Sequence, residues 1–341
     1  MLSKRLASLT CTALVAGAVF GLTTAAAASA APLSGAGSTL VAPIEAEWAA
    51  AWSQSTGNAS PTYQAVGSGA GLTDIGRGLV DFGASDAPLS ASTTPCNGCF
   101  QIPWALTATG VGFNVPGIHS LHLTGSVLAK IFLGQITNWN DKAITSLNKG
   151  EHFPNLAITP IHRADGSGDS YAFTDFLSSV SPQWRSQIGR ATKPAFPKGP
   201  GATGNGGMVT VLQQTRGGIA YIAVSYMIAH RLAAAAIKNQ AGHYEVPNLR
   251  NIANAASVGH EAGSGEIHIV NPPRRAKIAY PISTFTYVIL QPTDPLGNGG
   301  LLQQFVKYAL GPGQAFGPAL DFVPLPKNIK GADESAASRI H

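Results

Sequence analysis

The sequence predicts an α/β protein, because segments with strand patterns alternate along the chain with segments of helical periodicity. The chain has 341 residues, of which 45% are hydrophobic, so it is long enough to form two packed units with a sizeable core. Only 11% of the residues are charged, which argues against a disordered or coiled-coil protein.

The expected strands are short apolar runs of strand length, spread over most of the chain. They lie at 80–84, 107–115, 157–162, 218–224 and 284–290.

The expected helices are marked by apolar side chains that recur every three or four residues. We expect the aromatic members of these stripes to pack in the core rather than to bind a ligand. The three stripes are Ile44, Trp48 and Trp52; Leu72, Ile75 and Leu79; and Phe173, Phe176, Leu177 and Val180.

Two long segments lack such patterns. Segments 193–207 and 248–275 are rich in Gly, Pro and Asn and are expected to be surface loops. The polar tail 331–341 is expected to be mobile.

The N-terminus has the order of a secretory signal peptide. Lys4 and Arg5 precede the apolar run 9–22, and small residues end at Ala30. We therefore expect residues 1–30 to be removed on export, which places the protein in the periplasm or outside the cell; a membrane span is the alternative. Cys11 precedes most of the apolar run, where a lipid-modified cysteine would not lie.

The mature chain would keep two cysteines, Cys96 and Cys99, in a turn-rich stretch. A redox pair, half of a metal site and a structural disulfide are the alternatives. Zinc needs four ligands, and neither a second Cys pair nor a close His pair completes such a site. Because export implies an oxidising compartment, a local disulfide is expected.

The formal charge of +5 does not indicate a nucleic-acid partner. Proteins that bind DNA usually gather their basic residues on one face. Here Lys and Arg are scattered, and the densest pair beyond the N-terminus is Arg274–Arg275.

Three Gly-rich turns with Ser, Thr or Asp each precede a predicted helix: 35–39, 67–71 and 165–169. The start of a helix presents free N–H groups and the positive end of the dipole, so it can bind an anion. Plain helix capping is the alternative for any single turn. Three such turns in one chain favour a shared anion.

Two charged residues lie near these turns. Arg163 has a planar guanidinium that matches two oxygens of a tetrahedral oxyanion; its alternative role is an ion pair, with Asp165 as a partner. Asp86 follows a predicted strand. An ionised carboxylate only accepts hydrogen bonds, so it would favour an anion that still carries a proton and repel one that does not.

Motifs for catalysis are absent from the sequence. There is no phosphate-binding P-loop, no G-x-G-x-x-G that opens a helix, no H-E-x-x-H and no G-x-S-x-G. Ser167 has Asp169 nearby but no evident His base. We therefore expect a protein that is not an enzyme and that needs no cofactor or metal.

The chain resembles a known family, the PstS-type substrate-binding proteins of phosphate ABC transporters. The resemblance is strong from about residue 33 to 230 and weaker through 280–290 to the C-terminus. It is carried by GAGSTL (35–40), YQAVGSGAG (63–71), VDFGASDAPL (80–89), LGQITNWND (133–141), HRADGSGDS (162–170) and GNGGM (204–208).

The resemblance implies a type II periplasmic-binding-protein fold, in which two α/β lobes are joined by a two-stranded hinge. The first lobe would comprise 32–113 and 281–341, and the second 114–280. It further implies a monomer that binds inorganic phosphate between the lobes and delivers it to membrane permease subunits.

The family's ligand contacts carry over to motif positions of this chain. Asp86 would accept the phosphate proton, Arg163 would pair with phosphate oxygens and Asp165 would orient Arg163. The other positions would donate hydroxyl or backbone hydrogens. The complete expected set is Ser38, Thr39, Leu40, Ser68, Asp86, Arg163, Ser167, Gly168 and Asp169.

Asp169 departs from the enteric-type pattern of this family, where Thr or Ser is common, although other members carry Asp in the same context. If Asp86 and Asp169 each accept a proton, dihydrogen phosphate would be favoured, and binding would weaken as the pH rises past neutrality. The alternative is that Asp169 caps its helix and faces away from phosphate.

Overall fold

The strand β4 (Phe100–Asn114) is the element that connects the two halves of the fold. The computed structural model describes residues 32–89, 96–259 and 265–341. The first half of β4 pairs antiparallel with β12 (Ser283–Leu290), and the second half pairs antiparallel with β8 (Gly218–Ala223). All residues of β4 except the first and the last are buried, as expected for a strand covered on both faces.

The strands of the described residues form one mixed sheet in the order β2-β1-β3-β12-β4-β8-β6-β7, with β9 also paired to β4. A small second sheet has the order β11-β10-β5. The strands not yet delimited are β1 (Ser34–Gly37), β2 (Thr62–Gln64), β3 (Phe82–Ser85), β5 (His122–Leu123), β6 (Thr159–Arg163), β7 (Gly201–Ala202), β9 (Ala233–Ala234), β10 (Ala236–Lys238) and β11 (Tyr244–Glu245).

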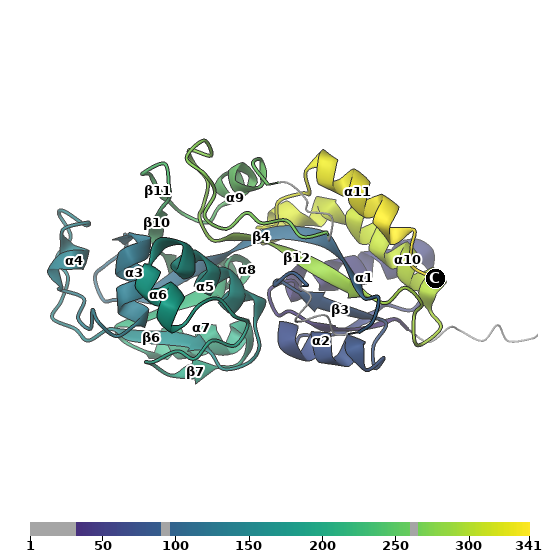
Figure 1. Cartoon of the computed structure of the whole chain (residues 1–341), viewed down its shortest axis with the longest axis horizontal. Helices are drawn as coiled ribbons and strands as arrows, with labels where there is room; N and C mark the ends of the chain where they lie inside the picture. Colours follow the sequence, from purple (N-terminus) through teal and green to yellow (C-terminus); the bar gives the residue numbers. More distant parts are fainter. Residues whose placement is uncertain (1–31, 90–95, 260–264) are drawn as a thin grey trace, which may run out of the picture. The chain divides into compact units, whose positions relative to one another are not determined.

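One group of helices packs with β1, β3 and β12 (Figure 1, purple and yellow). Trp48 and Trp52 of α1 lie in the core of this group, where they contact Trp104 and Phe305. Its helices are α1 (Ala42–Thr56), α2 (Ser68–Gly76), α10 (Gly299–Leu310), the 3₁₀ helix η1 (Pro312–Leu320) and α11 (Lys327–Ala337).

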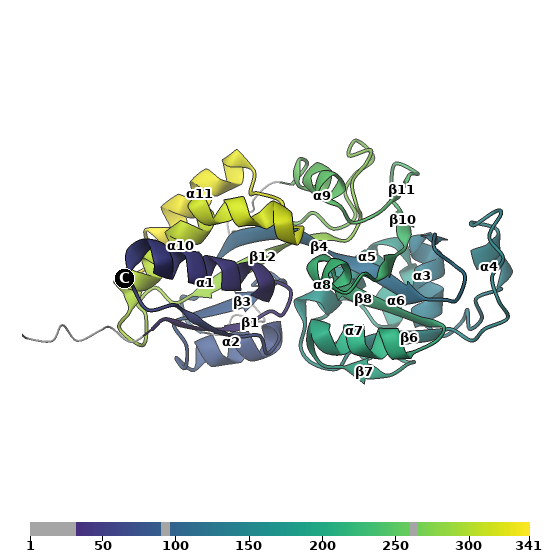
Figure 2. The ribbon, with the colours of Figure 1, turned by 180° about the vertical axis from the view of Figure 1, so that it is seen from behind.

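A second group packs with β6 and β8 (teal in Figure 1, and seen from behind in Figure 2). Phe132, Phe173 and Tyr221 form an aromatic cluster in its core, with ring centroids 4.5–6.2 Å apart. The remaining helices are α3 (Gly125–Phe132), α4 (Lys142–Thr145), α5 (Gly168–Val180), α6 (Pro182–Gln187), α7 (Gly204–Gln214), α8 (Val224–Ala229) and α9 (Leu249–Ala256).

The predicted α/β class is confirmed, and several local predictions are wrong. Helix α2 ends at Gly76, and the chain turns at Gly78 with a φ of 67°, which leaves Leu79 60% exposed rather than on a buried helical face. The expected loops contain β7, the start of α7, and α9, and the expected mobile tail is largely helix α11. Helix α9 buries an apolar stripe that includes Ile252, Ala255 and Ala256, and the sequence analysis missed this stripe.

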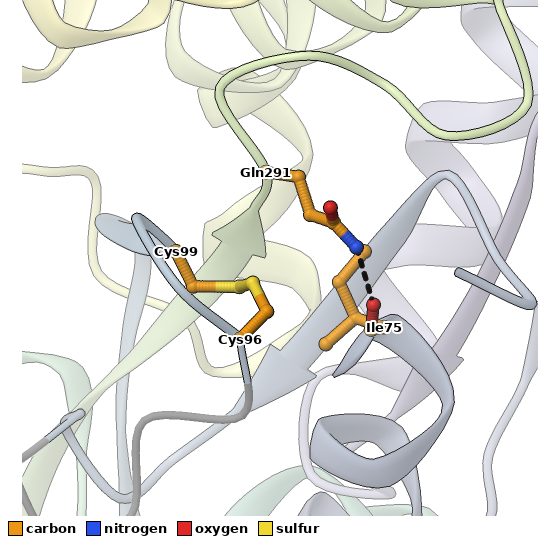
Figure 3. The surroundings of a disulfide bond; sticks show 4 residues. All are labelled: Ile75, Cys96, Cys99 and Gln291. Carbon is orange, nitrogen blue, oxygen red and sulfur yellow. Dashed lines mark hydrogen bonds between the residues drawn. A yellow bond between two sulfur atoms is a disulfide. The ribbon is translucent and has the colours of Figure 1, made fainter. Parts of the chain in front are cut away.

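The expected disulfide joins Cys96 and Cys99 just before β4 (Figure 3). Gly98 lies inside this short loop, and a Cβ there would be 3.4 Å from Pro292, directly after β12. The neighbouring Gln291 donates from its side chain to the carbonyl of Ile75 in α2 at 2.7 Å. The disulfide therefore lies beside contacts that join β12, β4 and α2.

The predicted signal peptide, residues 1–30, lies outside the described residues. Within the residues that are described, helices long and apolar enough to cross a bilayer are absent. The part of the chain that follows residue 30 forms one compact unit.

Candidate functional site

The ends of strands β1, β3 and β6 and the starts of helices α2 and α5 meet at one buried place. Ser38 and Thr39 follow β1, Asp86 follows β3, and Arg163 ends β6. All nine candidate residues are buried; the most exposed of those with a side chain, Thr39, is only 6% exposed. The hydrogen bonds described below join most of them into one network.

The three predicted turns differ in how they begin their helices. Ser167 caps α5, since its hydroxyl accepts a hydrogen bond from the N–H of Ser170, whereas α1 and α2 have no side-chain cap. Residues 35–37 belong to strand β1 rather than to a turn, which corrects the prediction. Gly37 has a φ of 145°, and a Cβ there would overlap the backbone of Ala84. The first turn is therefore shaped by strand packing.

Asp86 is the acidic centre of the network. Its Oδ2 accepts a hydrogen bond of 2.7 Å from the hydroxyl of Ser38, and its Oδ1 is buried without a hydrogen-bond partner among the described residues. Burial, together with the nearby charge of Asp169, raises the pKa of Asp86 to about 7. A carboxyl with this pKa changes charge near neutrality.

Ser68 and Gly168 bring the starts of α2 and α5 together. The hydroxyl oxygen of Ser68 accepts hydrogen bonds from the N–H groups of Gly168, at 3.1 Å, and of Asp86, at 3.4 Å. A Cβ on residue 168 would overlap the side chain of Asp86, so only glycine fits here. The N–H of Gly69 also donates to the carbonyl of Gly166, at 3.0 Å.

Arg163 is held by two carboxylates. Its Nε donates to Oδ1 of Asp165 at 2.7 Å, its Nη2 donates to Oδ2 of the same residue, and its Nη1 donates to Asp169 at 3.2 Å. The ion pair with Asp165 that the sequence left open is therefore present. Burial alone would raise the pKa of Asp165, but the hydrogen bonds and the charge of Arg163 outweigh burial and lower this pKa. Arg163 keeps its charge, because Asp165 and Asp169 outweigh the burial that would lower its pKa.

The carboxylate of Asp169 does not cap its helix, which corrects the alternative given for it. Oδ1 accepts from the hydroxyl of Thr109 at 2.7 Å, and Oδ2 accepts from Arg163 and from the side-chain amide of Asn205, the latter at 2.8 Å. Burial raises the pKa of Asp169, and these donors oppose the increase. The cap of α5 is Ser167, so Asp169 serves to join three elements.

Asn205, in the first turn of α7, is a site residue that the sequence analysis missed. Its side-chain amide also donates to Oγ1 of Thr39 at 2.9 Å, and its Oδ1 accepts from the N–H of Ala223 at 2.8 Å. It is fully buried. The GNGG stretch at 204–207 was a signal, because Asn followed by glycines is suited to a close backbone approach.

The arrangement gathers N–H, hydroxyl and guanidinium donors of the kind that a small anion needs, and among the described residues Ser167 and His162 have partners other than each other. The hydroxyl of Ser167 caps a helix, and the ring of His162 stacks on Phe196 with Nδ1 directed to the carbonyl of Arg163. Groups of His, Cys, Asp or Glu that could hold a metal ion are absent from the described residues.

Comparison with known proteins identifies the family of the chain. A family model described as "PBP superfamily domain" matches residues 22–312. A phosphate-binding protein PstS from Xylella fastidiosa (strain 9a5c) is 34% identical over 300 residues, which are 87% of this chain and 82% of the relative.

Solved structures share the fold. A high-affinity periplasmic phosphate-binding protein, PfluDING, bound with phosphate, superposes with a TM-score of 0.69 at 21% identity and covers 89% of this chain and 93% of its own. An ABC-type phosphate transport receptor from Vibrio cholerae has a TM-score of 0.57 at 18% identity and covers 86% of this chain and 100% of its own. The chain therefore belongs to the PBP superfamily and, within it, to the PstS family of phosphate-binding proteins.

Proposed function

We propose that this protein binds inorganic phosphate in the buried network around Asp86 and delivers it to the membrane permease of an ABC transporter, without converting it chemically. The relatives carry the name of binding proteins, and one structural neighbour is a phosphate transport receptor. Activity outside the cytoplasm requires export, so we place the mature protein in the periplasm or outside the cell, as a monomer.

The observation that carries the proposal is that many hydrogen-bond donors lie in one buried network with Oδ1 of Asp86, an acceptor without a partner among the described residues. Hydroxyl groups of Thr39 and Ser68 and the N–H groups of Leu40 and Gly168 lie in the network. The N–H of Gly168 donates to the hydroxyl oxygen of Ser68 in the structure. We propose that a phosphate oxygen takes this N–H on binding, and that the hydroxyls and the N–H groups of Ser167 and Asp169 complete the shell.

Arg163 would supply the positive charge. A guanidinium has five N–H groups, and the contacts with Asp165 and Asp169 use three of them, which leaves one on each terminal nitrogen. These two can donate side by side to two oxygens of a tetrahedral anion. Asp165 thus orients Arg163, and because Asp165 and Asp169 offset the charge of Arg163, recognition depends on directed hydrogen bonds.

Asp86 would select phosphate over sulfate. Phosphate keeps at least one proton near neutrality, and Oδ1 of Asp86 can accept it. Sulfate has no proton, so its lone pairs would face those of Oδ1. A buried acceptor without a donor costs roughly 1–3 kcal/mol, and more when it is charged. Because Asp169 already accepts three protein hydrogen bonds, we assign proton acceptance to Asp86 alone, in place of the two-acceptor hypothesis.

Access to the site requires movement, because its residues are buried. We propose that the chain opens between two lobes, 32–113 with 281–341 and 114–280, and that β4 and β12 form the hinge. The contacts that would break on opening include those from Gly168 to Ser68 and from Asn205 to Thr39.

Calorimetry with the mature protein tests the proposal. At pH 8 we expect phosphate to bind at one site, and sulfate and molybdate to bind much more weakly than phosphate. For Asp86→Asn we expect weaker phosphate binding and measurable sulfate binding. A wild-type protein that does not bind phosphate, or that binds sulfate equally well, would refute the proposed function.

A further inference from the structure

Every polar group of Ser38 is engaged within the protein. Its N–H donates to the carbonyl of Ala84 at 2.9 Å, and its carbonyl accepts from the hydroxyl of Tyr63 at 2.8 Å. Its Oγ accepts from the N–H of Leu40 at 3.0 Å and donates to Oδ2 of Asp86 at 2.7 Å. A serine hydroxyl has only one hydrogen, and Ser38 donates it to Asp86. Ser38 therefore has no hydroxyl hydrogen left to donate to a ligand.

The bond from Ser38 makes the two oxygens of Asp86 different. Oδ2 has a fully buried donor at short distance, whereas Oδ1 is buried without a hydrogen-bond partner in the described part of the chain. Both side chains are at most 2% exposed, so water does not offset this difference. Oδ2 of Asp86 is therefore occupied by a hydrogen bond within the protein, whereas Oδ1 can accept a hydrogen from a ligand.

We propose that Ser38 is a positioning residue, which acts on phosphate only through Asp86: its hydroxyl stabilises the ionised carboxylate and leaves Oδ1 as the acceptor of the ligand's proton. This inference rests on the proposed function and assigns Ser38 a different role from the direct ligand contact that the sequence predicts. Selectivity would then depend on a pair of residues, one of which does not touch the anion.

The hydrogen bond from Ser38 influences the pKa of Asp86 together with the charged groups around this carboxyl. Burial and Asp169 raise the pKa of Asp86 to about 7, while the hydrogen bond from Ser38, the nearby hydroxyl of Thr286 and the charge of Arg163 lower it. Asp86 also interacts with Tyr63 on β2: burial, together with the charge of Asp86, raises the pKa of the Tyr63 hydroxyl. On the other side, Asp86 lines a cavity of about 20 Å³, whose other titratable residues are Tyr171, Asp175, Glu266, His268 and Tyr287.

Loss of the Ser38 hydroxyl should therefore make Asp86 a weaker acid. A hydrogen bond to a charged group typically corresponds to a pKa shift of about one to two units. In Ser38→Ala, Asp86 would then be protonated at pH 8, and it would donate to sulfate rather than repel it. We expect the pH below which sulfate binds to move upward by about one to two units.

Ser85→Ala is the matched control. Ser85 is also fully buried and directly precedes Asp86, but its hydroxyl donates to the carbonyl of Ala87 at 2.7 Å. The substitution removes a buried serine hydroxyl next to Asp86 without removing a donor to its carboxylate. We expect Ser85→Ala to keep the wild-type midpoint for sulfate.

The test measures phosphate and sulfate affinity by calorimetry from pH 5 to 9, and the titration of the Asp86 carboxyl carbon by NMR without ligand. An alkaline shift in both measurements for Ser38→Ala, but not for Ser85→Ala, supports the proposal. An unchanged Asp86 titration refutes it. Ser38→Cys, whose thiol is a weaker donor, should shift in the same direction if Ser38→Ala does not fold.

The outcome also separates this inference from the proposed function. A wild-type protein that fails to bind phosphate at any pH overturns the proposed function, and the NMR titration still decides whether Ser38 controls Asp86. Normal phosphate binding by the wild type, with an identical sulfate midpoint in Ser38→Ala, overturns the role of Ser38 alone.

Discussion

Rejection of sulfate should depend on pH, because Asp86 changes charge within the accessible pH range. Its pKa is raised to about 7, first by burial and then by Asp169. Below this pH the carboxyl is neutral and can donate a hydrogen bond to a sulfate oxygen. Above it the carboxylate only accepts, and sulfate has no hydrogen to give. Sulfate should therefore bind to the protonated fraction of the protein.

The magnitude follows from that fraction. At pH 5 nearly all of Asp86 is protonated, whereas at pH 9 only about one molecule in 100 is, given a pKa of about 7. Sulfate affinity should fall about 100-fold between these two pH values, which corresponds to roughly 3 kcal/mol. The decrease should approach tenfold per pH unit above pH 7 and should level off below it.

Calorimetric titration with sulfate at constant ionic strength, in buffers without phosphate, measures this dependence. Asp86→Asn is the control, because an amide does not ionise and its sulfate affinity should stay constant over the same range. A wild-type affinity for sulfate that is independent of pH, or that increases toward pH 9, would refute the role given to Asp86.

Two further predictions concern other parts of the site, and a third concerns Glu45, a buried carboxyl of α1. In Arg163→Lys, one ammonium cannot reproduce the paired contacts with Asp165 and Asp169, so phosphate affinity should fall at least about 100-fold by calorimetry; a loss below about threefold would contradict this role. In Gly168→Ala, the added Cβ would overlap Asp86 and should abolish phosphate binding while circular dichroism stays native, and retained affinity would show that the close approach is not needed. Burial raises the pKa of Glu45 to about 8, so this carboxyl should lower stability progressively as the pH rises from about 4.5 to 8. Urea unfolding should show that Glu45→Gln stabilises the protein at pH 7 by about 2–3 kcal/mol more than at pH 5, and an equal effect at both pH values would exclude a buried neutral acid.

The chemical character of the site was predictable because its signals are local. Gly-rich turns before helices, one arginine after a strand and one aspartate after another strand follow from short motifs, and strand ends and helix starts commonly meet at ligand sites. The partners of these residues were not predictable. That Ser38 donates to Asp86 depends on the pairing of β1 with β3, and the tie from Asn205 to Thr39 joins residues 166 positions apart.

Errors in the fold prediction have the same origin. Leu79 continues the helical spacing of apolar residues in the sequence, but α2 ends at Gly76 and the chain turns at Gly78, which has a positive φ. Residues 35–37 have the composition of a turn and nevertheless form a strand, because small residues are needed where β1 packs against Phe82 and Ala84. Local pattern cannot reveal such a requirement, which arises only when distant segments pack together.

Thr109 is the residue at which β4 passes from one neighbouring strand to the other. Its N–H donates to Ile282 just before β12, it pairs in register with Ala223 of β8, and its hydroxyl donates to Asp169. Bending of the strand at this residue would therefore pull directly on a carboxylate that holds Arg163. If β4 bends as the proposed hinge, the Thr109 side chain would therefore transmit the backbone motion to the position of the Arg163 guanidinium.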